Sequence, residues 1–222
     1  MKKLIFLYVG ACCFILLNCA AYTSLEPMGQ GERSANLSFG GPIIKAFGTR
    51  IPIPYLTAGM NYGLRDRVNL NGDLHLFPLG YKVAGLNAGI TWFATLNEGI
   101  VPTWGIQPRL MLLASIKSDV EERARLYPFL TNTLSWKVQR GLLYLGMDYA
   151  YQFSKPDYDD EANPNIFSPF LGYRWRLGRN TRLYTELKWH GANIQSTRVA
   201  VDYVPIGNNG AVTTLFALER SF

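Results

Sequence analysis

Residues 142–153 alternate between two kinds of side chain almost without error. The odd-numbered positions are large and apolar, namely Leu143, Leu145, Met147, Tyr149, Tyr151 and Phe153. The even-numbered positions are mixed in character, namely Leu142, Tyr144, Gly146, Asp148, Ala150 and Gln152. Because a β-strand points successive side chains to opposite faces of its sheet, the pattern predicts a strand with one apolar face and one mixed face.

Alternation of the same kind recurs along most of the chain and predicts about ten antiparallel strands. Their expected ranges are 35–44, 54–64, 68–77, 81–93, 103–113, 127–138, 142–153, 166–177, 182–190 and 211–222. Most of these ranges are near the roughly 9–11 residues that a strand needs to cross a bilayer. Alternation alone leaves two architectures open. One is a membrane barrel with its apolar side chains outside, and the other is a water-soluble sandwich with them inside.

The N-terminus has the layout of a secretory signal peptide. Lys2 and Lys3 precede an apolar run over residues 4–17, which corresponds to a basic region followed by a hydrophobic one. The run is short for a membrane-spanning helix, which needs roughly 20 apolar residues. No second long apolar run follows, and the mean hydropathy of the chain is +0.01. A helical membrane protein is therefore excluded.

The end of this signal resembles the lipobox of bacterial lipoproteins. It reads Leu16-Leu17-Asn18-Cys19, with a leucine three residues before the cysteine. The resemblance implies a lipid attached to Cys19. Asn18 departs from the pattern, because a small residue usually precedes the acylated cysteine. Ordinary signal cleavage after Ala21 is the alternative.

Cysteine usage and charge narrow the classes of function. All three cysteines, Cys12, Cys13 and Cys19, lie in or at the end of the signal. The body therefore has no thiol nucleophile and no cysteine metal site, and we expect no metal and no cofactor. The formal net charge of +6 is not gathered into a run of basic residues, so nucleic acid is not an expected partner. A dispersed basic excess suits contact with anionic lipid headgroups or the phosphates of lipopolysaccharide.

Three further features favour the membrane barrel. The C-terminal residues 215–222 alternate and end in Phe222, which resembles the C-terminal signature of bacterial outer-membrane proteins. Aromatic residues lie near the expected strand ends, among them Trp92, Trp104, Tyr127, Trp136, Tyr151, Trp175 and Trp189, as in the aromatic girdles of such barrels. Connections at 65–67, 139–141 and 178–181 are short, whereas those at 115–126, 154–165 and 191–210 are longer. Short periplasmic turns and longer outer loops are typical of this class.

The resemblance to outer-membrane β-barrels covers the signal and nearly all of the body, at the level of architecture. It implies an all-β chain, folded as a transmembrane antiparallel β-barrel of about ten strands in the outer membrane of a Gram-negative-type bacterium. We expect a signal peptide at 1–18, a lipidated tether at 19–33 and the barrel at 34–222. An even number of strands places both termini in the periplasm. The expected partners are outer-membrane lipid, lipopolysaccharide and the barrel-assembly machinery, which reads the strand ending in Phe222.

Charged residues on the face opposite the apolar stripe are expected to point into the lumen. They are Asp73, His75, Arg109, Lys137, Asp148, Arg174, Arg176, Glu186, Lys188 and His190. They could line a narrow path for ions or small solutes, or they could form a network that fills the interior. Unpaired buried charge costs several kcal/mol per ion, which favours the filled interior. We expect Arg174 or Arg176 to pair with Glu186, with Asp148 as a further acceptor.

Two prolines fall inside expected strands, Pro108 and Pro169. Proline removes a donor from the hydrogen-bond ladder and is usually confined to edges and bulges. We therefore expect local bulges at these positions.

A catalytic role has only a faint signal. Trp189-His190-Gly191-Ala192-Asn193 resembles the His-x-Ser-Asn region of outer-membrane lipid A deacylases, which use an acyl-transfer triad. Ala192 stands where the serine nucleophile should be, so no catalytic residue is expected. The sequence favours a non-enzymatic surface or structural barrel whose outer loops contact lipopolysaccharide or external ligands. The alternatives are a narrow channel and a lipid A-modifying enzyme.

Overall fold

The computed structural model describes residues 23–46, 48–117, 124–153, 163–196 and 202–222. Within these ranges the chain forms eleven strands and one short 3-10 helix, η1. Their bounds are β1 Arg33–Ala46, β2 Thr49–Pro52, β3 Tyr55–Arg65, β4 Val68–His75, η1 Phe77–Tyr81, β5 Val83–Thr95, β6 Thr103–Ser115, β7 Ala124–Val138, β8 Gly141–Tyr151, β9 Asn165–Arg176, β10 Thr181–Gln195 and β11 Asn209–Ser221. No helix in the described ranges combines the length and apolar character needed to cross a membrane.

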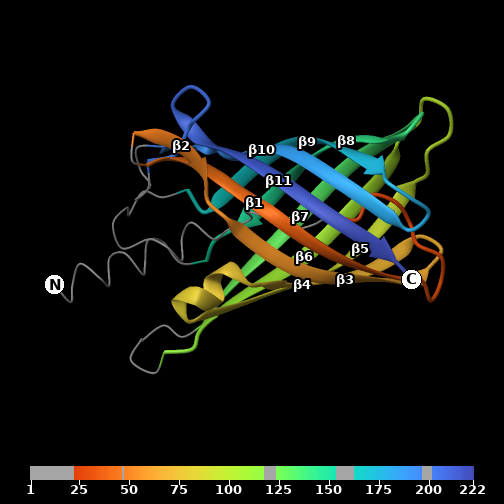
Figure 1. The fold of residues 1–222 in the computed structure, drawn as a ribbon, viewed down its shortest axis with the longest axis horizontal. Helices are drawn as coiled ribbons and strands as arrows, with labels where there is room; N and C mark the ends of the chain where they lie inside the picture. The colour runs from red at the N-terminus through yellow and green to blue at the C-terminus, as the bar shows by residue number, and fades with distance from the viewer. Residues whose placement is uncertain (1–22, 47, 118–123, 154–162, 197–201) are drawn as a thin grey trace.

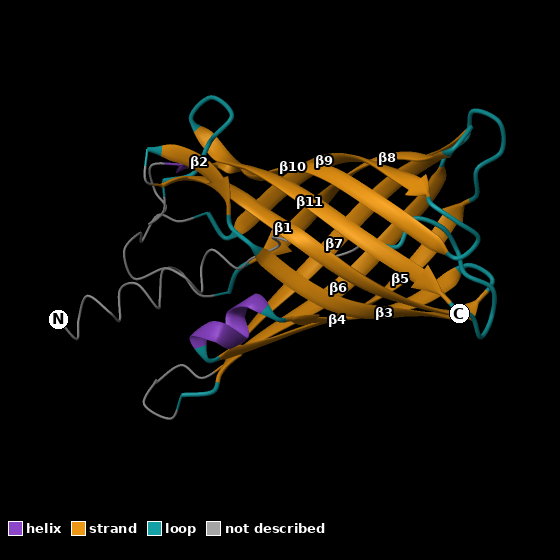
Figure 2. Ribbon diagram, viewed as in Figure 1, coloured by secondary structure: helices purple, strands orange, loops and turns teal. Residues whose placement is uncertain are grey.

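The strands form one closed antiparallel barrel (Figures 1 and 2). From β3 to β11 each strand pairs with the next in sequence, and β11 pairs with β1 to close the ring. β2 pairs only with the far end of β1, through residues 43–46. The wall therefore consists of ten strands, β1 and β3–β11, and the expected ten-strand barrel is confirmed.

The two faces of the wall have opposite character. Large apolar side chains point outward and are between 41% and 55% exposed, among them Leu37, Phe39, Met60, Leu74, Leu86, Ile90, Leu110, Leu145, Leu171, Leu187, Phe216 and Leu218. Polar side chains such as Asn69, Gln107 and Asp148 are buried inside. A water-soluble protein would not leave a continuous apolar band exposed, whereas lipid provides its natural solvent. The water-soluble sandwich is thus excluded, and the barrel spans a membrane.

Several element boundaries differ from expectation for local reasons. The strand expected at 68–77 ends at His75, and η1 follows, with Pro78 in its first turn and Lys82 in the left-handed region at φ 60°. Proline has a fixed φ that suits the start of a helix and lacks the N–H that a ladder needs. β7 begins at Ala124 and β10 continues to Gln195. Both extensions point toward the longer loops.

The bulges expected at Pro108 and Pro169 do not form. The β5–β6 register is the same on both sides of Pro108, which pairs with Leu130 of β7. Pro169 pairs with Met147 of β8, and the β9–β10 ladder stops one residue away at Phe170. Each proline is thus accommodated by an interruption or end of one ladder while the other continues. Both prolines are exposed on the outer face.

The two ends of the barrel differ in their connections. The turn end carries the β3–β4, β5–β6, β7–β8 and β9–β10 connections, together with the start of β1 at Arg33 and the C-terminus (Figure 1). The loop end carries η1 and the remaining connections, most of them longer. The N-terminal segment, residues 23–32, leads into β1 from the turn end.

Candidate functional site

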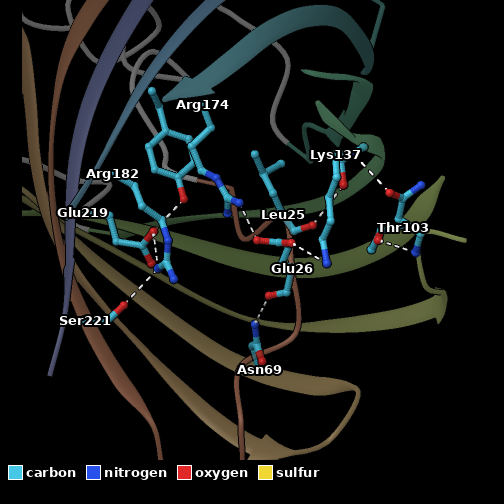
Figure 3. A network of polar contacts seen from close by, with 12 residues as sticks. Leu25, Glu26, Asn69, Thr103, Lys137, Arg174, Arg182, Glu219 and Ser221 are labelled. Atoms are coloured by element: carbon cyan, nitrogen blue, oxygen red, sulfur yellow. Dashed lines mark hydrogen bonds and ion pairs between the residues drawn. The ribbon is translucent and has the colours of Figure 1, made fainter. Parts of the chain in front are cut away.

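The N-terminal segment lies inside the lumen at the turn end (Figure 3). Leu25 is 2% exposed and belongs to the barrel's hydrophobic core cluster. Its carbonyl oxygen accepts a hydrogen bond from Ser135 Oγ of β7 at 3.1 Å. Toward β4, the Met28 N–H donates to Asn69 Oδ1 at 3.0 Å, and Asn69 Nδ2 donates to Ser24 Oγ at 2.8 Å. The segment is therefore held inside the lumen by contacts to β4 and β7, which are three strands apart in the wall.

Glu26 anchors the centre of this segment. Its carboxylate accepts a hydrogen bond from the Arg174 guanidinium of β9 and lies 3.4 Å from Lys137 Nζ at the end of β7. Burial would raise the pKa of the Glu26 carboxyl, but Arg174 and Lys137 outweigh this effect and hold the pKa below its ordinary value. The ion pair thus ties the segment to the wall.

This placement differs from that of a simple tether. The described part of the expected 19–33 tether packs against the barrel interior, because Leu25 and Glu26 each have a complementary site in the lumen. Cys19 and the expected signal peptide lie outside the described residues.

A second turn-end contact set surrounds Glu219 of β11. Its carboxylate accepts hydrogen bonds from Ser34 Oγ at 2.7 Å, from Tyr184 Oη at 2.6 Å and from Arg182 at 3.2 Å. A cavity of about 50 Å³ lies between these residues and the N-terminal segment, with Arg174 in its lining. This volume has room for a few water molecules and for nothing larger.

The middle of the lumen contains a central charge cluster, which we define as Arg109, Asp148, Glu186 and Lys188. Asp148 lies 3.1 Å from Arg109 Nη2 and 2.8 Å from Lys188 Nζ, and it also accepts a hydrogen bond from Thr131. Lys188 Nζ lies 3.1 Å from Glu186. The four side chains are between 1% and 3% exposed. Two positive and two negative groups thus compensate one another, as buried charge requires.

Aromatic rings fill the space around these charges. Lys188 Nζ lies 5.0 Å from the centre of the Phe170 ring, and the Arg109 guanidinium lies 5.9 Å from that of Phe129. The Tyr144 ring packs against Phe170 and occupies the space above Gly172, where any Cβ would collide with it. These contacts join side chains of neighbouring strands and fill the interior along β6–β10.

Seven of the ten charged residues expected in the lumen are buried, namely Asp73, His75, Arg109, Asp148, Arg174, Glu186 and Lys188. The other three, Lys137, Arg176 and His190, are not fully buried. Arg176 is the last residue of β9 and is exposed at the rim. Lys137 is near the turn end of β7, where 65% of its side chain is exposed.

The expected pairing of Arg174 or Arg176 with Glu186 is wrong. The β9–β10 register places Arg174 opposite Tyr184, while Glu186 lies opposite Gly172. Arg174 instead pairs with Glu26, and Glu186 pairs with Lys188. Asp148 is an acceptor as expected, but for Arg109 and Lys188.

The two histidines have separate partners. His75 contacts Tyr55 through Nδ1, and His190 Nδ1 lies 3.2 Å from Ser168 Oγ. A serine hydroxyl beside an imidazole can act as a nucleophile. Ser168, however, is 0% exposed and also accepts the N–H of Gly191 at 3.1 Å. The described geometry gives a substrate no access to this hydroxyl.

Sequence reasoning missed Glu26, Glu219 and Ser168 as members of the lumen network. Glu219 could have been found, because it has the inward parity of its strand, opposite to Leu218 and Phe222. Glu26 gives no such signal, because it lies in a segment without periodicity.

Similarity to known proteins is found among solved structures. No protein-family model matches the chain, and neither does any curated protein. Among solved structures, similarity extends to an outer-membrane channel from Pseudomonas putida F1 (12% identity, 91% of this chain and 100% of that one, TM-score 0.47). It also extends to the translocator domain of the autotransporter NalP from Neisseria meningitidis (11% identity, 89% of this chain and 91% of that one, TM-score 0.48). A third match is the porin NanC (11% identity, 86% of this chain and 98% of that one, TM-score 0.46).

These neighbours have different roles, as a channel, an autotransporter translocator and a porin. The fold and its membrane location follow from the strand pairing and the outward apolar band of this chain. The chain has the architecture of a bacterial outer-membrane β-barrel.

Proposed function

We propose that this chain is a non-enzymatic outer-membrane barrel with a structural or surface role and a closed lumen. The observation that carries the proposal is that ion pairs hold side chains inside the barrel at two levels, in the central charge cluster and between the N-terminal segment and the wall. A solute would have to break ion pairs at both levels. A lipid A-modifying activity is not part of the proposal, because Ser168 beside His190 is fully buried.

Conductance measurements test the closed-lumen proposal. The purified protein, inserted into planar bilayers, should conduct no more than the bare bilayer. A large, ion-selective conductance in the wild-type protein would overturn the closed-lumen proposal and favour the narrow channel.

The proposal includes an orientation and an anchor. The turn end, with the C-terminus and the N-terminal segment, faces the periplasm, because short turns are periplasmic in this class. Longer loops then face outward, where they contact lipopolysaccharide or external ligands. A lipid on Cys19 anchors the N-terminus. Metabolic palmitate labelling should be lost in Cys19→Ser while the barrel stays in the outer membrane, and unchanged labelling would rule out this site.

The second candidate function is a gated narrow channel. The observation that favours it is that the turn-end closure comes from a segment outside the strand ladder, held by side-chain contacts such as Glu26–Arg174. Release of that segment would unblock the turn end. The central charge cluster would still have to rearrange before solute could pass.

A further inference from the structure

The turn end carries a girdle of tryptophans that marks the level of the membrane interface. Trp92, Trp104, Trp136 and Trp175 all pair with residues at or near strand termini at this end, namely Val68, Thr95, Leu143 and Gly141. Three of them, Trp92, Trp104 and Trp175, are between 37% and 52% exposed. Indole rings prefer the level of lipid headgroups, because they combine an apolar ring with a polar N–H. The headgroups therefore lie at the turn-end margin of the barrel wall.

A rim of exposed arginines lies at this same margin. We define the arginine rim as Arg33, Arg65, Arg67, Arg140, Arg176, Arg179 and Arg220, all of them exposed. The exposed acidic residues described at this end are Glu32, Asp66 and Glu98. The Glu32 carboxylate already accepts a hydrogen bond from the Gly29 N–H at 2.8 Å. The rim is therefore strongly positive.

The guanidinium groups of the rim make few hydrogen bonds or other contacts within the described part of the chain. None of the seven forms an ion pair there. Arg33 lies over the Tyr62 ring at 5.9 Å, and Arg67 donates a long hydrogen bond of 3.4 Å to the Ala94 carbonyl. Each guanidinium has five donors in a planar fork that suits phosphate oxygens.

Strand pairing also brings arginines next to one another. Arg220 pairs with Ala35, and the Phe222 N–H donates to the Arg33 carbonyl, so Arg33 and Arg220 are diagonal neighbours on adjacent strands. At the β7–β8 turn, the Arg176 N–H donates to the Arg140 carbonyl at 3.3 Å. Like charges directly opposite one another on paired strands are destabilising. An anion bound between neighbouring arginines would compensate their charge.

The direction of two of these side chains indicates where that anion comes from. Arg33 shares its parity with the outward Leu37 and Phe39, and Arg220 shares its parity with the outward Phe216 and Leu218. Both therefore project from the outer wall at the level of the tryptophan girdle, away from the lumen. A partner at that place and level belongs to the membrane.

We propose that the arginine rim binds the phosphates of anionic phospholipids in the leaflet that contacts the turn end. The choice of phospholipid over lipopolysaccharide rests on the periplasmic orientation proposed above. The loop end provides the contrast, because one of its exposed cations, Lys45, is already paired with Asp202 at 3.2 Å. Arg50 and Lys82 are also exposed at the loop end and provide a matched control.

The experiment uses the turn-end tryptophans as reporters. The full-length protein is refolded into phosphatidylcholine vesicles, and brominated phosphatidylglycerol replaces part of the lipid. Bromine quenches nearby indole fluorescence, so the quenching excess over brominated phosphatidylcholine gives the relative affinity for the anionic lipid. The variant R33Q/R220Q is compared with R50Q/K82Q, which removes the same charge from the loop end. Heat-modifiable gel migration confirms that each variant folds, and R33K/R220K provides a variant that keeps the charge.

We expect the wild-type protein to prefer phosphatidylglycerol and R33Q/R220Q to lose roughly five-fold or more of that preference. R50Q/K82Q should keep it, and R33K/R220K should keep part of it. Equal loss in both glutamine variants, or no preference in the wild type, would overturn the proposal. Stronger competition from lipid A than from phosphatidylglycerol would reject phospholipid as the source, and displacement by millimolar inorganic phosphate would reject a membrane ligand. None of these outcomes depends on conductance, so a failure here is distinct from a failure of the closed-lumen proposal.

Discussion

The closed-lumen proposal rests on two sets of contacts that differ in kind. In the middle, the closing side chains belong to wall strands β6, β8 and β10, and all four charges are almost completely buried. At the turn end, the closing residues belong to a segment that forms no part of the strand ladder, and the Glu26 side chain is 22% exposed. The central closure is therefore inseparable from the barrel, whereas the turn-end closure can in principle be lost while the barrel stays folded.

This difference gives the two levels different energetic roles. Removing one partner from the centre leaves a buried charge without its partner, which costs several kcal/mol. Removing one partner at the turn end leaves charges that water can reach, and the cost is smaller. Mutations at the two levels should therefore separate stability from access to the lumen.

Asp148→Ala should have the largest effect. It leaves Arg109 and Lys188 without their shared carboxylate, and breaking such a buried arrangement costs about 3–5 kcal/mol. Urea unfolding of the protein in lipid vesicles, followed by tryptophan fluorescence, measures the loss. Asp148→Asn also removes the charge but keeps the shape and the Thr131 contact, so the difference between the two variants separates lost packing from lost charge. A change in unfolding free energy below about 1 kcal/mol in Asp148→Ala would contradict a structural role for the cluster.

The outer wall at the same level gives the next largest effect. Leu145 lies on β8, three residues from Asp148, and faces outward. Leu145→Arg places a charge against lipid near the middle of the wall and should destabilise the barrel by roughly 2–4 kcal/mol. Leu145→Phe keeps the apolar surface and should be nearly neutral. If both variants unfold alike in vesicles, the outward face does not contact hydrocarbon.

The turn end should respond more weakly. Glu26→Gln removes the charge that Arg174 and Lys137 share, and we expect a loss of about 1–2 kcal/mol. Unfolding in vesicles measures it, with Glu32→Gln as a control, because Glu32 bonds only the nearby Gly29 N–H among the described residues.

Conductance sharpens the same comparison. Glu26→Gln should stay at background in planar bilayers, because the central charge cluster still closes the lumen. An ion-selective current in this variant but not in the wild type would make the N-terminal segment the gate and would favour the second candidate function.

The wall was predictable from sequence for a simple physical reason. Successive residues of a strand point alternately outward and inward. Outward positions face lipid and are apolar, whereas inward positions pack among polar groups and are polar. The residue pair Leu145 and Asp148 illustrates this, because each faces as its parity predicts. The bulges expected at the prolines were wrong, because each proline interrupts the hydrogen bonds of one ladder only. The sequence does not show that the ladder on the other side of Pro108 or Pro169 is intact.

The interaction partners inside the lumen were less predictable than the direction, inward or outward, in which each strand residue points. Parity places Arg174 and Glu186 on the same face, but only the register shows that Glu186 lies opposite Gly172. Glu26 is 148 residues away from Arg174 and has no local pattern that directs it into the barrel. A contact between a non-periodic segment and a distant strand depends on the closed ring, which no single stretch of sequence encodes.

The last and smallest effect is a pH dependence confined to the turn end. The pKa of Glu26 is lower in the folded protein than its ordinary value of 4.5, because Arg174 and Lys137 outweigh the effect of burial. A lowered folded-state pKa contributes stability that is fully present above the unfolded-state pKa and is lost as pH falls through the folded-state pKa. The free-energy difference between wild type and Glu26→Gln should therefore be constant near neutral pH and shrink as the pH falls below about 4.5. Unfolding measured in zwitterionic vesicles at a series of pH values tests this, and a difference that stays constant down to the lowest pH would mean that Glu26 contributes through packing and not through its charge.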